Sequence, residues 1–261
     1  MTAERAVEIL RRRVRELDDD MRLQVCDEPE RYFMHFVRVL HSYYPSSMGP
    51  PGSSVIAPTE ADGLIDSSRL MASISNKAPN LADGPLLRKH QHWIATRRHT
   101  QSQGQVPKPI KSKFGDPRNA DDRGRSSLSP VRVGLSTSTP ARSGNSMWEM
   151  YLDLFHSEST FGPRFVWNLE TLDVPVLEIH SATDWVRLVE GYGRNVDGLI
   201  YPDWAKVTEA FAGVHLTARA VAATQGFSFE TERGITAPAF WDVEQTLWLR
   251  WVFNRVSLVA A

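Results

Sequence analysis

Apolar residues recur at helical spacing in the first part of the chain. Over residues 3–23 they fall three and four apart, which predicts a helix with a single apolar stripe. Residues 29–44 repeat the pattern, and Pro29 suits a first helical turn because no backbone N–H is needed there. The pattern therefore predicts an N-terminal helical region, residues 1–44, whose two helices can pack as a hairpin.

The helical pattern stops at Pro45. From there to residue 128 the chain is rich in Pro, Gly, Ser and basic residues, with scattered apolar positions. Prolines with a fixed φ and permissive glycines interrupt long elements, so residues 45–128 are predicted to form a linker or a long loop region. Two amphipathic stretches within it, 64–75 and 85–99, predict short helices.

Strand and helix patterns mix in the last part of the chain, residues 129–261. Seven of the eight tryptophans lie from Trp148 onward, which indicates a packed core because each indole buries a large apolar area. The clearest strand pattern is at 247–253, where large apolar side chains alternate. A regular βαβ rhythm is missing, so we predict an α+β fold with a mixed or antiparallel sheet core and short helices, preceded by the N-terminal helical pair. Other strands are predicted at 131–139, 164–169, 174–179, 214–217 and 227–229, and helices at 147–155, after Ser181 and from Pro202 to Gly213.

The charge of the chain is balanced overall but not locally. The formal net charge is −1, yet between Leu86 and Arg142 there are twelve Lys or Arg residues and only three acids. Such a segment can follow a phosphate backbone, and a solvated linker of the same composition is the alternative. The side chains predicted to contact nucleic acid are Arg97, Arg98, Lys111 and Lys113.

Two further features concern the environment of the protein. The single cysteine, Cys26, excludes an internal disulfide and fits a reducing cytoplasm. No stretch approaches the roughly 18 apolar residues that a membrane span needs, and the N-terminal stretch lacks an apolar run of signal-peptide length. We therefore expect a cytoplasmic protein with no membrane partner. The excess of arginine over lysine, 24 to 6, is typical of chains from high-GC bacteria.

Two short motifs carry candidate chemistry. The hydroxyl-rich run Leu135–Thr139 closes a predicted strand, where small hydroxyls can support a bound nucleotide or orient an acidic side chain. The second motif, residues 242–244, is Asp-Val-Glu and precedes the last predicted strand. A carboxylate flanked there by Trp241 and Trp248 would be partly desolvated, and suited to bind a hydroxyl or to stabilise a cation-like transition state. A Ser/Thr-rich strand end and a solvated turn are the structural alternatives.

The order of these motifs resembles the ADP-ribosyltransferase superfamily, whose NAD-binding core has an arginine on an early strand, a Ser-Thr-Ser on a middle strand and a glutamate in a late E-x-E or Q-x-E motif. The matching residues are Ser136-Thr137-Ser138 and Glu244, with Asp242 where the family has Glu or Gln. The resemblance implies transfer of ADP-ribose from NAD to a macromolecular acceptor. It implies that Glu244 holds a ribose hydroxyl and supports oxocarbenium character, that Ser136 orders the site, and that an aromatic side chain stacks on nicotinamide. The residues implied to bind NAD are Arg132, Thr137, Ser138, Asp242 and Trp248.

The arginine that this resemblance requires has two candidates. Arg132 lies on the same predicted strand as the Ser-Thr-Ser, and Arg38 lies in the second predicted helix. The gap from Ser138 to Glu244 is also longer than is usual in the family. Whether the protein is an enzyme is open at this point, because a non-enzymatic module that binds nucleic acid through residues 86–142, or docks another protein, is the alternative.

Two histidines offer a second type of site. His180 and His215 both lie at or near predicted strand ends. With Asp184 or Asp203 they would form a metal site or a general-base pair, and hydrogen-bonded structural histidines are the alternative.

Overall fold

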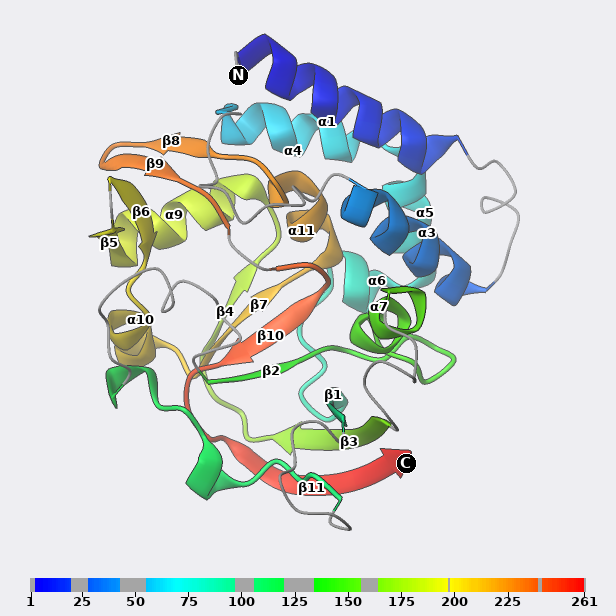
Figure 1. The fold of residues 1–261 in the computed structure, drawn as a ribbon, viewed down its shortest axis with the longest axis vertical. Coiled ribbons are helices and arrows are strands. Elements are labelled where there is room, and N and C mark those ends of the chain that lie inside the picture. Colours follow the sequence, from blue (N-terminus) through cyan, green and yellow to red (C-terminus); the bar gives the residue numbers. More distant parts are fainter. Residues whose placement is uncertain are drawn as a thin grey trace.

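In the residues that it describes, the computed structural model has three β-sheets with helices packed around them (Figure 1). Two of the sheets combine parallel and antiparallel neighbours and the third is antiparallel, which confirms the predicted α+β class. The described residues are 3–19, 28–42, 55–96, 106–119, 134–155, 164–196, 198–238 and 241–260.

The central sheet has the strand order β2-β10-β7-β4. β10 runs antiparallel to both of its neighbours, and β4 runs parallel to β7. Every residue of β7 and β10 is buried, so both faces of these two strands are covered by other parts of the molecule. The strands are β2 (Leu135–Thr137), β4 (Val176–Ile179), β7 (Gly213–Leu216) and β10 (Gln245–Trp248).

A second sheet, with the order β1-β3-β11, is antiparallel throughout. Its strands are β1 (Gln91–Thr96), β3 (Arg164–Thr171) and β11 (Phe253–Ala260). The prediction of one continuous strand at 247–253 is wrong. β10 ends at Trp248, and the backbone N–H groups of Leu249 and Arg250 donate to Ala212 O, so the chain turns from the central sheet into the second one. Trp248 and Phe253 belong to one apolar cluster, which explains the unbroken apolar pattern.

The third sheet has the order β5-β6-β9-β8 and lies beside helix α9 in Figure 1. β5 and β6 form a hairpin whose turn contains Gly198 at φ 84°, a conformation that favours glycine. Its strands are β5 (Gly193–Val196), β6 (Leu199–Pro202), β8 (Phe229–Thr231) and β9 (Gly234–Thr236).

Two of the helices between the strands begin at side-chain caps that are visible in the sequence. Ser181 accepts a hydrogen bond from the Asp184 N–H at the start of α9. Ser146 and Glu149 form the reciprocal capping box at the start of α7. The predicted helix ending at Gly213 is shorter, since α10 ends at Ala210, and Gly213 begins β7. A Cβ on Gly213 would lie 3.0 Å from Leu247 O, so close strand packing explains the glycine. These helices are α7 (Met147–Phe155), α9 (Ala182–Tyr192), α10 (Trp204–Ala210) and α11 (Ala218–Thr224).

The N-terminal helices pack onto the same core as the strands. The buried Arg13 of α1 donates to Ala222 O at 2.8 Å and Gln225 O at 2.7 Å, and so binds the carbonyl end of α11. α1 and α3 confirm the two predicted helices. The helices are α1 (Ala3–Asp18), α3 (Pro29–Ser42), α4 (Pro58–Asp66), α5 (Arg69–Lys77) and α6 (Pro79–Ala82).

The stretch predicted as a linker contains ordered elements. α4, α5, α6 and β1 all lie within residues 55–96, and each has buried residues, so a linker is the wrong description of this part. The helix expected at 85–99 is also wrong, because Gln91–Thr96 pairs with β3 as a strand. Two short 3-10 turns follow, η2 (Lys111–Lys113) and η3 (Pro117–Asn119).

Candidate functional site

A row of polar residues crosses the central sheet. Thr137 pairs with Thr246, Thr246 with His215, and His215 with Glu178, so one residue from each of the four strands lies at the same level. Residues directly opposite one another on neighbouring strands point to the same face. Glu244 lies two residues before Thr246, just ahead of the first residue of β10.

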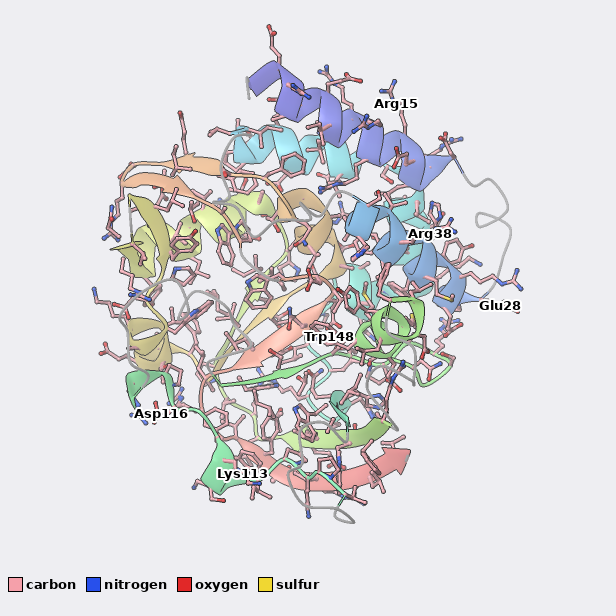
Figure 2. All side chains as sticks on the ribbon, in the orientation of Figure 1. Arg15, Glu28, Arg38, Lys113, Asp116 and Trp148 are labelled. Carbon is pink, nitrogen blue, oxygen red and sulfur yellow. The ribbon has the colours of Figure 1, made fainter. Side chains whose placement is uncertain are left out.

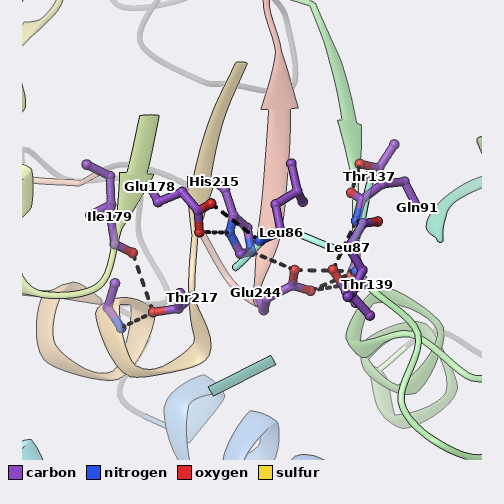
Figure 3. Close-up of polar contacts among 12 residues, drawn as sticks. Leu86, Leu87, Gln91, Thr137, Thr139, Glu178, Ile179, His215, Thr217 and Glu244 are labelled. Carbon is purple, nitrogen blue, oxygen red and sulfur yellow. Dashed lines mark hydrogen bonds and ion pairs between the residues drawn. The ribbon is translucent and has the colours of Figure 1, made fainter. Parts of the chain in front are cut away.

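The Glu244 carboxylate is fully buried and accepts hydrogen bonds from three groups. Ser138 Oγ donates to its Oε2 at 2.7 Å, and the Thr139 N–H donates to the same oxygen at 3.0 Å. The Nε2 of His215 lies 3.0 Å from Oε1 (Figure 3). These three contacts fix the position of the Glu244 side chain.

His215 lies between two carboxylates. Its Nε2 faces Glu244, and its Nδ1 lies 3.4 Å from Glu178 Oε2. Burial disfavours the charged ring, but the hydrogen bonds and charges of Glu178 and Glu244 outweigh burial and raise the pKa of His215 to about 9. Burial alone would raise the pKa of Glu178. Its contacts with His215 and the Leu86 N–H outweigh burial and lower this pKa overall. At neutral pH Glu178 is therefore a carboxylate and His215 an imidazolium.

Neutral groups extend the network on the side of β2. Thr137 Oγ1 donates to Gln91 Oε1 at 2.6 Å, and Gln91 Nε2 donates to Thr139 Oγ1 at 3.0 Å. Trp248 Nε1 donates to Thr137 Oγ1 at 2.8 Å. Thr137 and Trp248, both implied by the resemblance to bind NAD, are thus buried and bind one another, and Gln91 connects them to Thr139.

Of the two serines in the Ser-Thr-Ser triplet, Ser138 is the one that contacts Glu244. Ser136 pairs with Leu247 across the sheet, and its buried Oγ has no hydrogen-bond partner among the described residues. Among the described residues Ser138, and not Ser136, is therefore the serine of the triplet that binds the Glu244 side chain.

Asp242 lies outside this network. Its Oδ1 accepts a hydrogen bond from Gln225 Nε2 at 3.2 Å, and burial raises its pKa although this hydrogen bond opposes the rise. Its charge also acts on Tyr151 of α7, whose pKa is raised to about 12, mainly by burial. The two acids of the motif thus occupy different environments, one facing α11 and α7 and one inside the sheet.

Among the described residues, no arginine donates a hydrogen bond to Glu244. In the part of the chain that the structure describes, the hydrogen bonds of Glu244 come from Ser138, Thr139 and His215. Arg38 is exposed on α3 (Figure 2). Arg132 lies outside the described residues, so its assignment stays a prediction.

The basic segment is described only in part. Lys111 and Lys113 are exposed on η2, with Lys113 near the end of the molecule where β11 lies (Figure 2). Arg118 pairs with Asp116 at 2.6 Å. Arg97 and Arg98 lie outside the described residues, so nucleic-acid contact through this segment stays a prediction.

Both histidines of the alternative site face Glu178. His180 Nε2 lies 3.8 Å from Glu178 Oε2, the oxygen that His215 Nδ1 also faces. Among the described residues there is no group of three His, Cys, Asp or Glu side chains that could hold a metal ion. Glu178 was not among the site residues predicted from the sequence. A single acid inside the apolar run 174–179 is the signal that could have found it.

Comparisons of the chain with models of protein families, with curated proteins and with solved structures found no match. Within the described residues, no helix combines the length and the apolar character that crossing a membrane requires.

Proposed function

We propose that the protein transfers ADP-ribose from NAD to a macromolecular acceptor, with Glu244 as the catalytic carboxylate. The observation that carries the proposal is the 2.7 Å hydrogen bond between Ser138 and Glu244, which are 106 residues apart in sequence. A serine of the Ser-Thr-Ser triplet beside the late glutamate is the juxtaposition that the resemblance requires. Asp242, two residues before Glu244, holds the first acidic position of the motif.

The chemistry of the Glu244 environment supports this reaction. Departure of nicotinamide leaves positive charge on the ribose, and an ionised carboxylate fixed in a low-dielectric site stabilises such charge without reorganising. The carboxylate is buried and held by three donors, so its position is set before substrate binds. The bond from C1′ of the ribose to the nicotinamide nitrogen breaks, and a bond from C1′ to the acceptor atom forms.

The burial of Glu244 sets a condition on substrate binding. Its side chain has 0% exposure, and its two oxygens already serve three donors. Because the surrounding residues cover Glu244, a ribose hydroxyl reaches this carboxylate only if binding of NAD moves some of them aside, such as those at the end of β2. The roles proposed for Glu244 and Ser138 concern the ribose that carries nicotinamide.

Labelling with NAD tests the proposal. Purified protein is incubated with NAD labelled in the adenosine moiety and a bacterial lysate, and label on macromolecules is measured. We expect Glu244→Gln to lower labelling at least about a hundredfold, because the amide removes the negative charge. Ser138→Ala is the second variant, and the exposed Glu230→Gln on β8 is the matched control. Circular dichroism and thermal unfolding show that each variant is folded. Equal labelling by wild type and a folded Glu244→Gln variant would exclude Glu244 from the reaction.

A further inference from the structure

The His215 ring can satisfy both of its neighbours in only one protonation state. A neutral imidazole has one N–H donor and one acceptor nitrogen, whereas the charged ring donates from both nitrogens. Both nitrogens of His215 face carboxylate oxygens, at 3.0 Å for Glu244 and 3.4 Å for Glu178. With both carboxyl groups ionised, a neutral ring would set a nitrogen lone pair against a carboxylate, so this arrangement favours the imidazolium.

The two carboxylates differ in their access to water. Glu244 is completely buried, whereas the Glu178 side chain is 25% exposed. Glu178 also accepts a long hydrogen bond from the Leu86 N–H at 3.4 Å and has His180 at 3.8 Å. The charged groups that act on the ring are thus Glu178 from β4 and Glu244 from the residues before β10, and β2 contributes the neutral Ser138. Glu178 is the member that can be changed without leaving a hole deep in the core.

We propose that His215 and Glu178 are positioning residues for Glu244: Glu178 pairs with the charged His215 ring, and the ring holds the Glu244 side chain oriented for the transfer reaction. This inference rests on the proposed function for its kinetic consequences, but not for its electrostatic ones. A purely structural role is a poor account of the cluster, because apolar side chains of similar volume fill a core at lower cost than a buried ion pair does. Neither residue contacts the reacting atoms; both act through Glu244.

The electrostatic part is tested without any activity measurement. The ring protons or carbons of His215 are followed by NMR as the pH is raised, with His215→Gln used to assign the signal. We expect the ring to stay charged up to a pH of about 9 in the wild type. In Glu178→Gln, the midpoint should fall by at least about one pH unit, since one of the two carboxylates is lost. Glu170→Gln, on the exposed Arg255 ion pair of β3, is the control and should leave the midpoint unchanged. A wild-type midpoint near 6.5, or an unchanged midpoint in Glu178→Gln, would overturn the inference.

The kinetic part uses the pH profile of transfer. The wild-type kcat should hold up to about pH 9 and then fall, because the imidazolium is lost. The falling limb should move to lower pH in Glu178→Gln and stay in place in Glu170→Gln, and His215→Gln should lower kcat about a hundredfold with little change in KM. If His215→Gln does not fold, Glu178→Gln decides alone. An active wild type with superimposable profiles for Glu178→Gln refutes the positioning role, whereas an inactive wild type refutes the proposed function and leaves the NMR titration to judge the cluster.

Discussion

Two of the ion-pair clusters in this molecule contrast in burial. In the first, His215 bridges Glu178 and Glu244 inside the central sheet, and the side chains of His215 and Glu244 have 0% exposure. In the second, Arg219 of α11 pairs with Asp66 at the end of α4 and with Asp83 after α6, with exposures of 23%, 60% and 33%. Both clusters join segments that are distant in sequence, but the His215–Glu244 pair is closed to water, whereas every member of the second cluster is partly exposed.

The contrast separates two reasons for keeping charges in a fold. Exposed ion pairs contribute about 0–1 kcal/mol each, because water competes for both partners. A buried cluster costs several kcal/mol of desolvation per ion, and its own attraction only offsets that cost. The Arg219 cluster is therefore a modest tether between helices. The His215 cluster is an expensive arrangement, and perturbed titratable groups of this kind concentrate at functional sites.

The largest effect is expected from removing the charge at the centre of the buried cluster. His215→Leu leaves the buried Glu244 side chain without its charged partner, and should lower the free energy of unfolding by about 3–5 kcal/mol. Glu178 can turn toward water, so Glu244 is the group that carries the cost. Urea unfolding at pH 7 measures the loss. Combining His215→Leu with Glu244→Met should recover part of it, and a loss below about 1 kcal/mol in the single variant would contradict the burial argument.

The second-largest effect is expected from pH, which changes the charge of the His215 cluster but not that of the Arg219 cluster. The folded-state pKa of His215 is about 9, against 6.5 for an unperturbed histidine. Because the folded pKa is the higher one, this contribution is fully present below pH 6.5 and is lost as the pH rises toward 9. The loss amounts to at most about 3 kcal/mol. The arginine of the second cluster stays charged throughout this range. Urea unfolding of wild type and Glu178→Gln between pH 6 and 9.5 checks this, and equal slopes for the two proteins would argue against it.

Local signals in the sequence predict the helices well. The Ser146 and Glu149 capping box and the Ser181 cap depend on residues three apart, so the chain shows them directly. The segment 85–99 is a different case. Its strand exists because Gln91–Thr96 pairs with β3, and pairing of this kind depends on partners about 70 residues away. The same limit explains why 247–253 reads as one strand although its two halves belong to different sheets.

The site follows the same rule. The Ser-Thr-Ser triplet and Glu244 are visible as short motifs, and the structure brings Ser138 to Glu244. Which serine of the triplet would do so could not be predicted, because it depends on where β2 ends. The pairing of His215 with Glu178 depends on the register between β4 and β7, which adjacent residues do not reveal. The sequence thus indicated Glu244 and, for a different type of site, His215, and the fold brought the two together and added Glu178.

The smallest effect is expected from the exposed cluster, and salt makes it separable from the buried one. Arg219 donates to Asp66, Asp83 and Ser75, so Arg219→Met removes several partly solvated contacts and should lower the free energy of unfolding by about 1 kcal/mol. Because salt screens exposed charges, this loss should shrink in 1 M NaCl, whereas the loss in His215→Leu should not. Paired urea titrations at low and high salt measure both. If Arg219→Met costs as much as His215→Leu at either salt concentration, burial is not what distinguishes the two clusters.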